Sequence, residues 1–354
     1  MANGRRRATQ ADIARHLGVS QATVSIALSG GAAAEQVAPA TRQSVLELAA
    51  ELGYSANAVA RSLRGGRNRI LGLFTFEPVF PIEQRDFYYP FLVGVEQGAA
   101  ESDHELLLFT SAGATGSRRI YARGENRLKV ADGCVLLGRQ MDRDDLARLV
   151  REDFPFVFIG HREVEGAELS YVAADYRSAT RDIVRRLIEL GHTEFAYLRE
   201  AGGLEPTRDR EAGLWDAIDH AGISREHVRI QTSDHAIATD PAQLCGWVDS
   251  GVTAFIVEPT ADRLVIDAVA EAAEAAGIRI PEDCSMVLLG DSTSSGVTRD
   301  WSRFSMPRTE MGRAAVRLLI EMLDNDQDEA RHLYLPCLPV AGDSVALPRG
   351  NGTI

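Results

Sequence analysis

No stretch of this 354-residue sequence approaches the roughly 20 consecutive apolar residues that a membrane-spanning helix needs. The basic N-terminus MANGRRRATQ leads into no apolar segment, so we expect no secretory signal and no membrane partner. The sequence contains four cysteines, with no CxxC spacing and no histidine pairs near them. We therefore expect small buried thiols in a reducing cytosol, rather than disulfides or metal ligands, at Cys134, Cys245, Cys284 and Cys337.

Signatures of catalysis and of cofactor binding are also missing. The sequence has no GxGxxG after a candidate strand, no Walker A motif, no nucleophile elbow and no His/Cys set with metal-ligand spacing. Its 45% hydrophobic and 25% charged residues are ordinary for a globular protein, and its length allows two or three domains. We therefore expect a protein that is not an enzyme, with no catalytic residues, no metal and no cofactor.

Positive charge is scarce in most of the chain, whose net charge is −13, but it is concentrated near the N-terminus. The first 70 residues contain nine arginines and four acidic residues, a net charge of +5, so the remaining 284 carry −18. A basic head on an acidic body indicates a local module that binds a polyanion. Ordinary solvated charge is the alternative.

The segment ADIARHLGVSQATVSIALSGG has the pattern of two short helices joined by a turn. Thr9 and Asp12 have the spacing of a capping box, and Gly18 provides the positive φ that a tight turn needs. The spacing predicts that the first helix buries Ile13, Ala14 and Leu17.

Ser20, with Thr23 three residues later, predicts the start of the second helix. Its inward residues are Val24, Ala27 and Leu28, and its outward residues are Gln21, Ala22, Ser25 and Ile26. A third helix is predicted from Pro39 to Gly53, with an apolar face of Val45, Leu46, Leu48, Ala49 and Leu52. This is a helix-turn-helix layout, whose second helix enters the major groove of DNA. A three-helix cap without a ligand is the alternative, but the outward face is small and uncharged, as reading DNA requires.

Several longer motifs, spread over almost the whole chain, point to one family. TQADIARHLGVSQATVSIALSG, TRQSVLELAAELGYSANAVARSLRGGR and ILGLF, followed by GVEQGAAESDHELLLFT, IELGHTEFAYL, EAAGIRIPEDCSMVLLGDS and EMGRAAVRLLI, resemble the LacI/GalR family of bacterial repressors. The resemblance implies a cytoplasmic regulator, associated with the nucleoid when it is bound to double-stranded DNA.

The resemblance also implies contacts to DNA. Gln21 and Ala22 would face base edges, and the hydroxyl residues Thr9, Ser20, Thr23 and Tyr54 would contact phosphates, with Ser25, Ile26 and Thr41 also at the interface. The family usually has arginine where this chain has Ile26. Because isoleucine can contact a thymine methyl group but not guanine acceptors, the operator is expected to differ from the common half-site.

The segment SANAVARSLRGGRNR follows the predicted third helix. Asn57 can cap a helix of about seven residues that ends at Gly65, which is too short to be stable alone. By itself this segment reads as a flexible linker. The resemblance implies a hinge helix that folds when paired over DNA, with Leu63 wedged into the minor groove and Asn57 and Ala60 lining it.

From Ile70 onward, apolar runs alternate with amphipathic segments. The strands are expected in RILGLFTF, ELLLFT, GCVLLG, FPFVFIG, FAYL, VRIQT, TAFIVE and SMVLLG, and the helices at 91–102, 142–151, 176–190, 208–221, 240–250, 261–276 and 307–323. This alternation predicts parallel sheets flanked by helices. The fold class is therefore an all-α helix-turn-helix head plus an α/β two-lobed body that resembles type I periplasmic binding proteins.

The resemblance implies a domain division and a dimer. The head would comprise residues 1–56, the hinge and linker 57–69, and the effector-binding body 70–354. One lobe would combine about 70–173 with 304–326, and the other about 174–303 with 327–354. Two copies would pair through helices near 91–102 and 261–290 and present both heads to a palindromic operator.

Effector residues are expected where strands end. The resemblance favours Arg210 and Asp291, and Asp262 is what is left of a usual Asn-Asp pair. His161, at the end of a predicted strand, and the aromatic residues Phe76 and Phe91, which could stack on a sugar face, are further candidates. The alternatives are a surface charge for Arg210, a helix cap for Asp291 and core packing for the aromatic residues. Gly160 and Pro307 depart from the sugar-binding pattern. The expected function is an effector-controlled repressor that responds to a sugar or related metabolite. A phosphorylated or nucleoside effector, and an architectural DNA-binding protein without a ligand, stay open.

Overall fold

The computed structural model describes residues 8–29, 36–54, 67–77, 82–110, 118–121, 124–139, 141–233, 240–259, 265–291, 299–325 and 329–349. The chain divides into two compact units, Met1–Asn68 and Arg69–Ile354. We call them the head and the body. Among the described residues no helix is long and apolar enough to cross a membrane.

The head contains helices α1 (Gln10–Leu17), α2 (Gln21–Ser29) and α4 (Pro39–Glu51). The predicted capping box is confirmed, because Asp12 N donates to Thr9 Oγ1 at 3.3 Å and Thr9 N donates to Asp12 Oδ2 at 3.0 Å. Gly18 ends α1 with a φ of 67°, which a side chain would strain. At the start of α2, Thr23 N donates to Ser20 Oγ at 3.0 Å.

The three helices of the head bury one common core. Its fully buried members include Ile13, Val24 and Val45. The predicted apolar face of α4 is only partly correct, because Leu46 and Leu52 are 41% and 42% exposed. Leu46 follows Val45 directly, so a helix turns it about 100° away from the core. Leu52 lies at the C-terminal cap.

The first sheet of the body has the strand order β11-β5-β4-β3-β1-β2, and all its neighbouring strands are parallel. Its strands are β1 (Ile70–Thr75), β2 (Glu105–Phe109), β3 (Gly133–Leu137), β4 (Phe156–Ile159), β5 (Tyr171–Ala174) and β11 (His332–Leu335). The second sheet has the order β12-β10-β9-β8-β6-β7, in which only the β10–β12 pair is antiparallel. Its strands are β6 (Phe195–Glu200), β7 (Val228–Ser233), β8 (Ala254–Val257), β9 (Ser285–Leu288), β10 (Ser302–Ser305) and β12 (Leu338–Val340).

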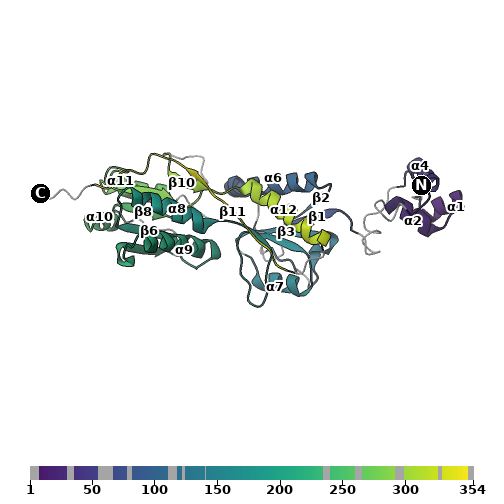
Figure 1. Ribbon diagram of the computed structural model, residues 1–354, viewed down its shortest axis with the longest axis horizontal. Coiled ribbons are helices and arrows are strands. Elements are labelled where there is room, and N and C mark those ends of the chain that lie inside the picture. The colour runs from purple at the N-terminus through teal and green to yellow at the C-terminus, as the bar shows by residue number, and fades with distance from the viewer. Residues whose placement is uncertain are drawn as a thin grey trace, which may run out of the picture. The chain divides into compact units, whose positions relative to one another are not determined.

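Helices cover both faces of each sheet, as Figure 1 shows for the body. Lobe 1 is the first sheet with α6 (Ile82–Glu101), α7 (Arg143–Arg151), α12 (Arg308–Asn325) and the 3₁₀ turn η1 (Arg127–Val130). Lobe 2 is the second sheet with α8 (Tyr176–Glu189), α9 (Glu205–His220), α10 (Pro241–Asp249), α11 (Val265–Ala275) and the turn η2 (Arg225–His227). Helices α6 and α12 cross closely, because a Cβ at Gly94 would lie 1.9 Å from Thr309 O.

The chain passes between the lobes after β5, after β10 and again before β12. The last crossing lies later than the division drawn from the resemblance, which assigned residues 327–354 to the second lobe. Strand β11 instead pairs with β5, with His332 opposite Tyr171. Strand β10 joins the second sheet, so lobe 1 resumes at α12. Backbone pairing therefore shifts both boundaries.

Candidate functional site

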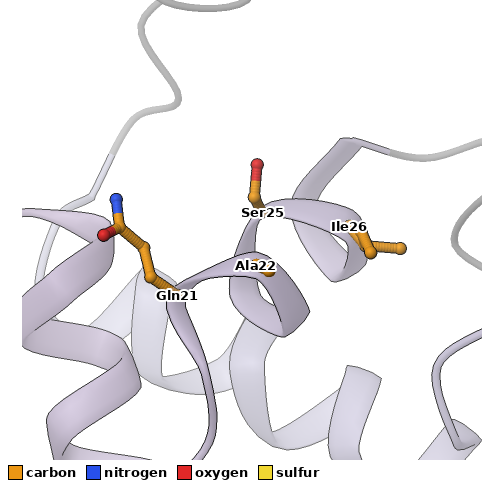
Figure 2. A pocket seen from close by; sticks show the side chains of 4 residues that line it. All are labelled: Gln21, Ala22, Ser25 and Ile26. Carbon is orange, nitrogen blue, oxygen red and sulfur yellow. The ribbon is translucent and has the colours of Figure 1, made fainter.

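The outward surface of α2 carries four small or uncharged side chains. Gln21 and Ala22 are exposed, and Ser25 and Ile26 are half-buried. Figure 2 shows these four residues around one hollow. Ile26 also packs against the core of the head. The surface thus offers an amide and a hydroxyl for hydrogen bonds beside two apolar groups, the kinds of contact that base edges in the major groove accept.

Hydroxyl groups lie at the N-termini of the first two helices. Thr9 and Ser20 are exposed, and Ser20 Oγ lies 2.8 Å from Thr23 Oγ1. Helix N-termini attract anions through their free N–H groups and their dipole. Thr41 is half-buried in the first turn of α4, and Tyr54 packs against the core of the head. The predicted hinge residues Asn57, Ala60 and Leu63 lie outside the described residues.

Arg210 is the centre of a buried polar group in lobe 2. It lies on α9, is 6% exposed, and its Nε donates to Leu289 O, just beyond β9, at 2.9 Å. Its guanidinium carbon lies 4.0 Å from the centre of the Tyr176 ring. Burial opposes its charge, but Tyr176 and Glu258 outweigh burial and raise the pKa of Arg210. Because Arg210 is buried and bonds the chain just beyond β9, it does not fit the alternative of a charge on the helix surface.

Glu258 directly follows β8 and is 1% exposed. Its carboxylate accepts hydrogen bonds from the Tyr197 hydroxyl and from Thr207 Oγ1, the latter at 3.0 Å. Burial raises the pKa of Glu258, while Arg210 and the two hydroxyl donors oppose the rise. This acid was not predicted, although its place at the end of the apolar run TAFIVE was a usable signal.

Asp291 follows β9, and its bonding partners all lie in the segment that leads from β10 into lobe 1. Its Oδ1 accepts from Arg303 at 2.9 Å, and its Oδ2 accepts from Met306 N at 3.1 Å and lies 3.3 Å from Arg308. Both carboxylate oxygens are therefore already bonded. The side chain anchors the segment between β10 and α12.

Lobe 1 contributes a second buried arginine at the ends of its strands. Arg162, 7% exposed, donates to Gly138 O at 2.9 Å and to His161 O at 2.6 Å. Its guanidinium carbon lies 5.0 Å from the centre of the Phe158 ring. Tyr176, half-buried, packs against the cores of both lobes. Burial raises its pKa, and the charges of Arg210 and Arg162 oppose the rise. We call Arg162, Tyr176 and Arg210 the arginine site.

A set of ion pairs joins the two lobes beside the arginine site. His161 Nδ1 lies 2.9 Å from Asp209 Oδ2, and Arg143 Nη2 lies 2.8 Å from Glu205 Oε1. Glu163 pairs with Arg208 at 2.6 Å, and its N donates to Glu205 at 3.1 Å. The interlobe ion pairs are thus Arg143, His161 and Glu163 of lobe 1 with Glu205, Arg208 and Asp209 of lobe 2.

Two of the predicted effector residues lie in the core of lobe 1. Phe76 is 5% exposed and stacks on Phe158 at 6.1 Å between ring centres, and Phe91 is 3% exposed between the sheet and α12. This agrees with the core-packing alternative. Asp262 lies outside the described residues. The structure thus brings Arg210 and His161 to the meeting of the lobes, together with Arg162 and Tyr176, which sequence reasoning missed.

The head and the body together define a two-part DNA-binding regulator, with a helix-turn-helix reader and a body like a periplasmic binding protein. A family model for bacterial regulatory proteins of the lacI family matches residues 9–57, and one for a periplasmic binding protein-like domain matches residues 184–345. The chain belongs to the lacI family of bacterial regulatory proteins. It is a DNA-binding transcriptional regulator.

Full-length relatives agree with this membership. The HTH-type transcriptional regulator CelR of Thermobifida fusca is 28% identical over 336 residues, covering 94% of this chain and 96% of CelR. MalR of Streptomyces coelicolor is 29% identical over 357 residues, covering 97% of this chain and 98% of MalR. The solved CelR–cellobiose complex is 25% identical, with a TM-score of 0.63 and coverage of 96% and 100%. The lac repressor dimer bound to operator and an anti-inducer shares the fold, at 20% identity, a TM-score of 0.65 and coverage of 96% and 100%.

Proposed function

We propose that the protein is a homodimeric repressor whose affinity for a palindromic operator is set by a small effector, a sugar or related metabolite, bound between the two lobes. The observation that carries the proposal is the meeting of buried polar side chains from the strand ends of both lobes at Tyr176. In α/β sheets, ligands bind outside the carboxyl ends of the strands. A regulator of this kind acts in the cytoplasm, at the nucleoid.

Relatives support both halves of the proposal. CelR was solved with cellobiose, and the lac repressor was solved as a dimer on its operator. We assign residues 1–56 to DNA reading, 57–69 to the hinge and 70–354 to effector binding and dimerisation. Effector binding would change the relative position of the lobes and hence the spacing at which two hinges can pair over DNA.

The reading surface is proposed to be Gln21, Ala22, Ser25 and Ile26. Phosphate contacts are assigned to Thr9, Ser20, Thr23, Thr41 and Tyr54, and minor-groove contacts to Asn57, Ala60 and Leu63. Arg210 and His161 are proposed to contact or flank the effector. Asp291 is proposed to sense it through the crossover segment, and Asp262 is retained as a candidate.

Selection from a random duplex pool tests DNA reading by the full-length protein. We expect enrichment of a two-fold symmetric word whose half-sites place T·A where Ile26 reaches the groove. The proposal fails if no symmetric word is enriched and affinity depends on salt but not on sequence, which is the behaviour of an architectural protein.

The variant Leu63→Ala tests the hinge. Removing a side chain that wedges between base pairs should weaken binding to the selected operator by about tenfold or more, and binding to random DNA much less. Gel-shift titrations on both duplexes measure the two effects, with the exposed Leu46→Ala in the head as the matched control. Equal affinities for Leu63→Ala and the parent protein on both duplexes would contradict the hinge assignment.

A further inference from the structure

The two arginines of the arginine site are buried without a carboxylate partner. Arg162 and Arg210 are 7% and 6% exposed. Among the described residues neither guanidinium has a carboxylate oxygen within the 4.0 Å of an ion pair. Their contacts are backbone carbonyls and the faces of Phe158 and Tyr176. Arg303 and Arg308, close by, both pair with Asp291, so ion pairing is otherwise the rule in this region.

The acidic groups around the arginine site form their hydrogen bonds and ion pairs with other residues, and none lies within ion-pair distance of Arg162 or Arg210 among the described residues. Glu258 is held by Tyr197 and Thr207. Glu205 is held through Oε1 by Arg143 and by the backbone of Glu163, while its buried Oε2 has no hydrogen-bond partner among the described residues. Glu77 accepts from the Tyr88 hydroxyl at 2.9 Å and from Arg139 N at 2.7 Å. These carboxylates offset the guanidinium charges only from a distance.

A buried cation without a close counter-ion is unfavourable, and proteins normally pair such charges. Burial accordingly lowers the pKa of Arg162, whereas at Arg210 the effects of Tyr176 and Glu258 outweigh burial and raise the pKa. An aromatic ring face compensates a guanidinium charge only in part. A group that complements such guanidinium charges is an anion with two or three acceptor oxygens, because the guanidinium fork matches carboxylate and phosphate geometry.

We propose that Arg162 of lobe 1 and Arg210 of lobe 2 hold an acidic group of the effector, so that the effector is an anionic sugar carrying a carboxylate or a phosphate. This inference rests on the effector-binding function proposed above. It adds Arg162 as a residue that determines effector specificity and narrows the ligand class. An anion held by both lobes would favour their closure, since it attracts one buried positive charge on each lobe.

Isothermal titration of the full-length dimer with matched ligands tests the inference. The acidic ligands are glucuronate, gluconate and glucose 6-phosphate, and their neutral counterparts are glucose and cellobiose. At equal ionic strength we expect an acidic ligand to bind at least about tenfold more tightly than its neutral counterpart. Comparing the carboxylates with the phosphate identifies the source of the charge.

Each result decides between two statements. If cellobiose or glucose binds and no acidic ligand binds more tightly, the anion inference is overturned while the effector function stands. If no ligand of either class binds, both are contradicted. Acidic ligands that bind more tightly than the neutral ones and also change operator affinity support both the anion inference and the proposed effector function.

Arg162→Met and Arg210→Met test the assignment to residues. We expect each to reduce acidic-ligand affinity by about tenfold or more and neutral-ligand affinity by less than about threefold. The ligand-free Tm of Arg162→Met should change little, because the removal of an unpaired buried charge offsets the loss of its hydrogen bonds to Gly138 O and His161 O. Arg177→Met, whose side chain is 60% exposed and pairs with Asp216, is the matched control. Equal losses for both ligand classes, or a large fall in the ligand-free Tm, would show that Arg162 has only a structural role.

Discussion

Two histidines of the body have pKa values that are shifted in opposite directions by their surroundings. The hydrogen bond to Asp209 raises the pKa of His161, with help from the charge of Glu163 and against burial. Burial lowers the pKa of His192, which is 1% exposed and lies 2.8 Å from Thr253 Oγ1 and 2.9 Å from Ala346 O. The folded state therefore favours a charged His161 and a neutral His192.

These directions give a prediction about stability and pH. The contribution of His161 is complete below its unfolded pKa of about 6.5 and is lost as pH rises through its higher folded pKa. The contribution of His192 is present above about 6.5 and is lost as pH falls through its lower folded pKa. Urea unfolding of His161→Gln and His192→Gln at several pH values measures both. The stability difference from the parent protein should shrink with rising pH for His161→Gln and grow for His192→Gln. The same trend in both variants would refute the assignment.

At the scale of elements, the helices of the head depend on local signals that a substitution can remove. Thr9→Ala deletes the cap of α1 and should destabilise the head by about 1 kcal/mol. Gly18→Ala forces a Cβ into the left-handed region and should cost a comparable amount, about 1 kcal/mol. Hydrogen exchange of the amides of α1 and α2 in the full chain reports both effects.

Ser44→Ala is the control for these two substitutions. Its exposed hydroxyl bonds only Ala40 O within α4 at 3.1 Å, so its removal should leave exchange in α1 unchanged. Two results would contradict the capping argument: faster amide exchange throughout the head in Ser44→Ala, or no increase in amide exchange in Thr9→Ala.

The same local signals explain which elements could be predicted. Features that depend on residues adjacent in the sequence were predicted and are present in the structure. They are the capping box at Thr9, the turn at Gly18 and the apolar runs of β1, β3, β4 and β8. The short strands β10 (SRFS) and β12 (LPV) carry no periodic pattern. They depend on tertiary pairing, β10 with β9 and β12, and β12 with β10. Strand β11 was not predicted, and its residues were assigned to the second lobe, because only tertiary pairing places them in the first sheet.

Some residues of the candidate site could be predicted from the sequence and others could not. Arg210 was predicted because its position matches a family pattern, and His161 because it stands at the end of a predicted strand. Arg162 was missed because the meaning of its charge depends on what surrounds it after folding, namely Gly138, Phe158 and Tyr176. Glu258 and Glu77 each follow an apolar strand directly, and that signal could have been used.

At the scale of the whole molecule, the interlobe ion pairs are placed to bias the opening of the body. Arg143, His161 and Glu163 belong to lobe 1, and their partners all lie on the first turns of α9 in lobe 2. Glu205 is 1% exposed, so its bond to Arg143 is shielded from water on one side. Exposed pairs contribute little, whereas a pair with a buried member loses more when one partner is removed.

Breaking these pairs should therefore change how the body responds to its effector. Arg143→Met and Glu205→Gln are each expected to favour the open form and to weaken effector binding by a few-fold, because part of the binding free energy must then close the lobes. If the two side chains act as a pair, the double variant should lose less than the sum of the single losses. Effector titrations on the four proteins complete this cycle. The control is Arg185→Met, an exposed arginine whose ion pairs are with Asp182 and Glu189 of the same helix, α8. Strictly additive losses would mean that the two residues act separately. Unchanged affinities would mean that lobe closure is set elsewhere.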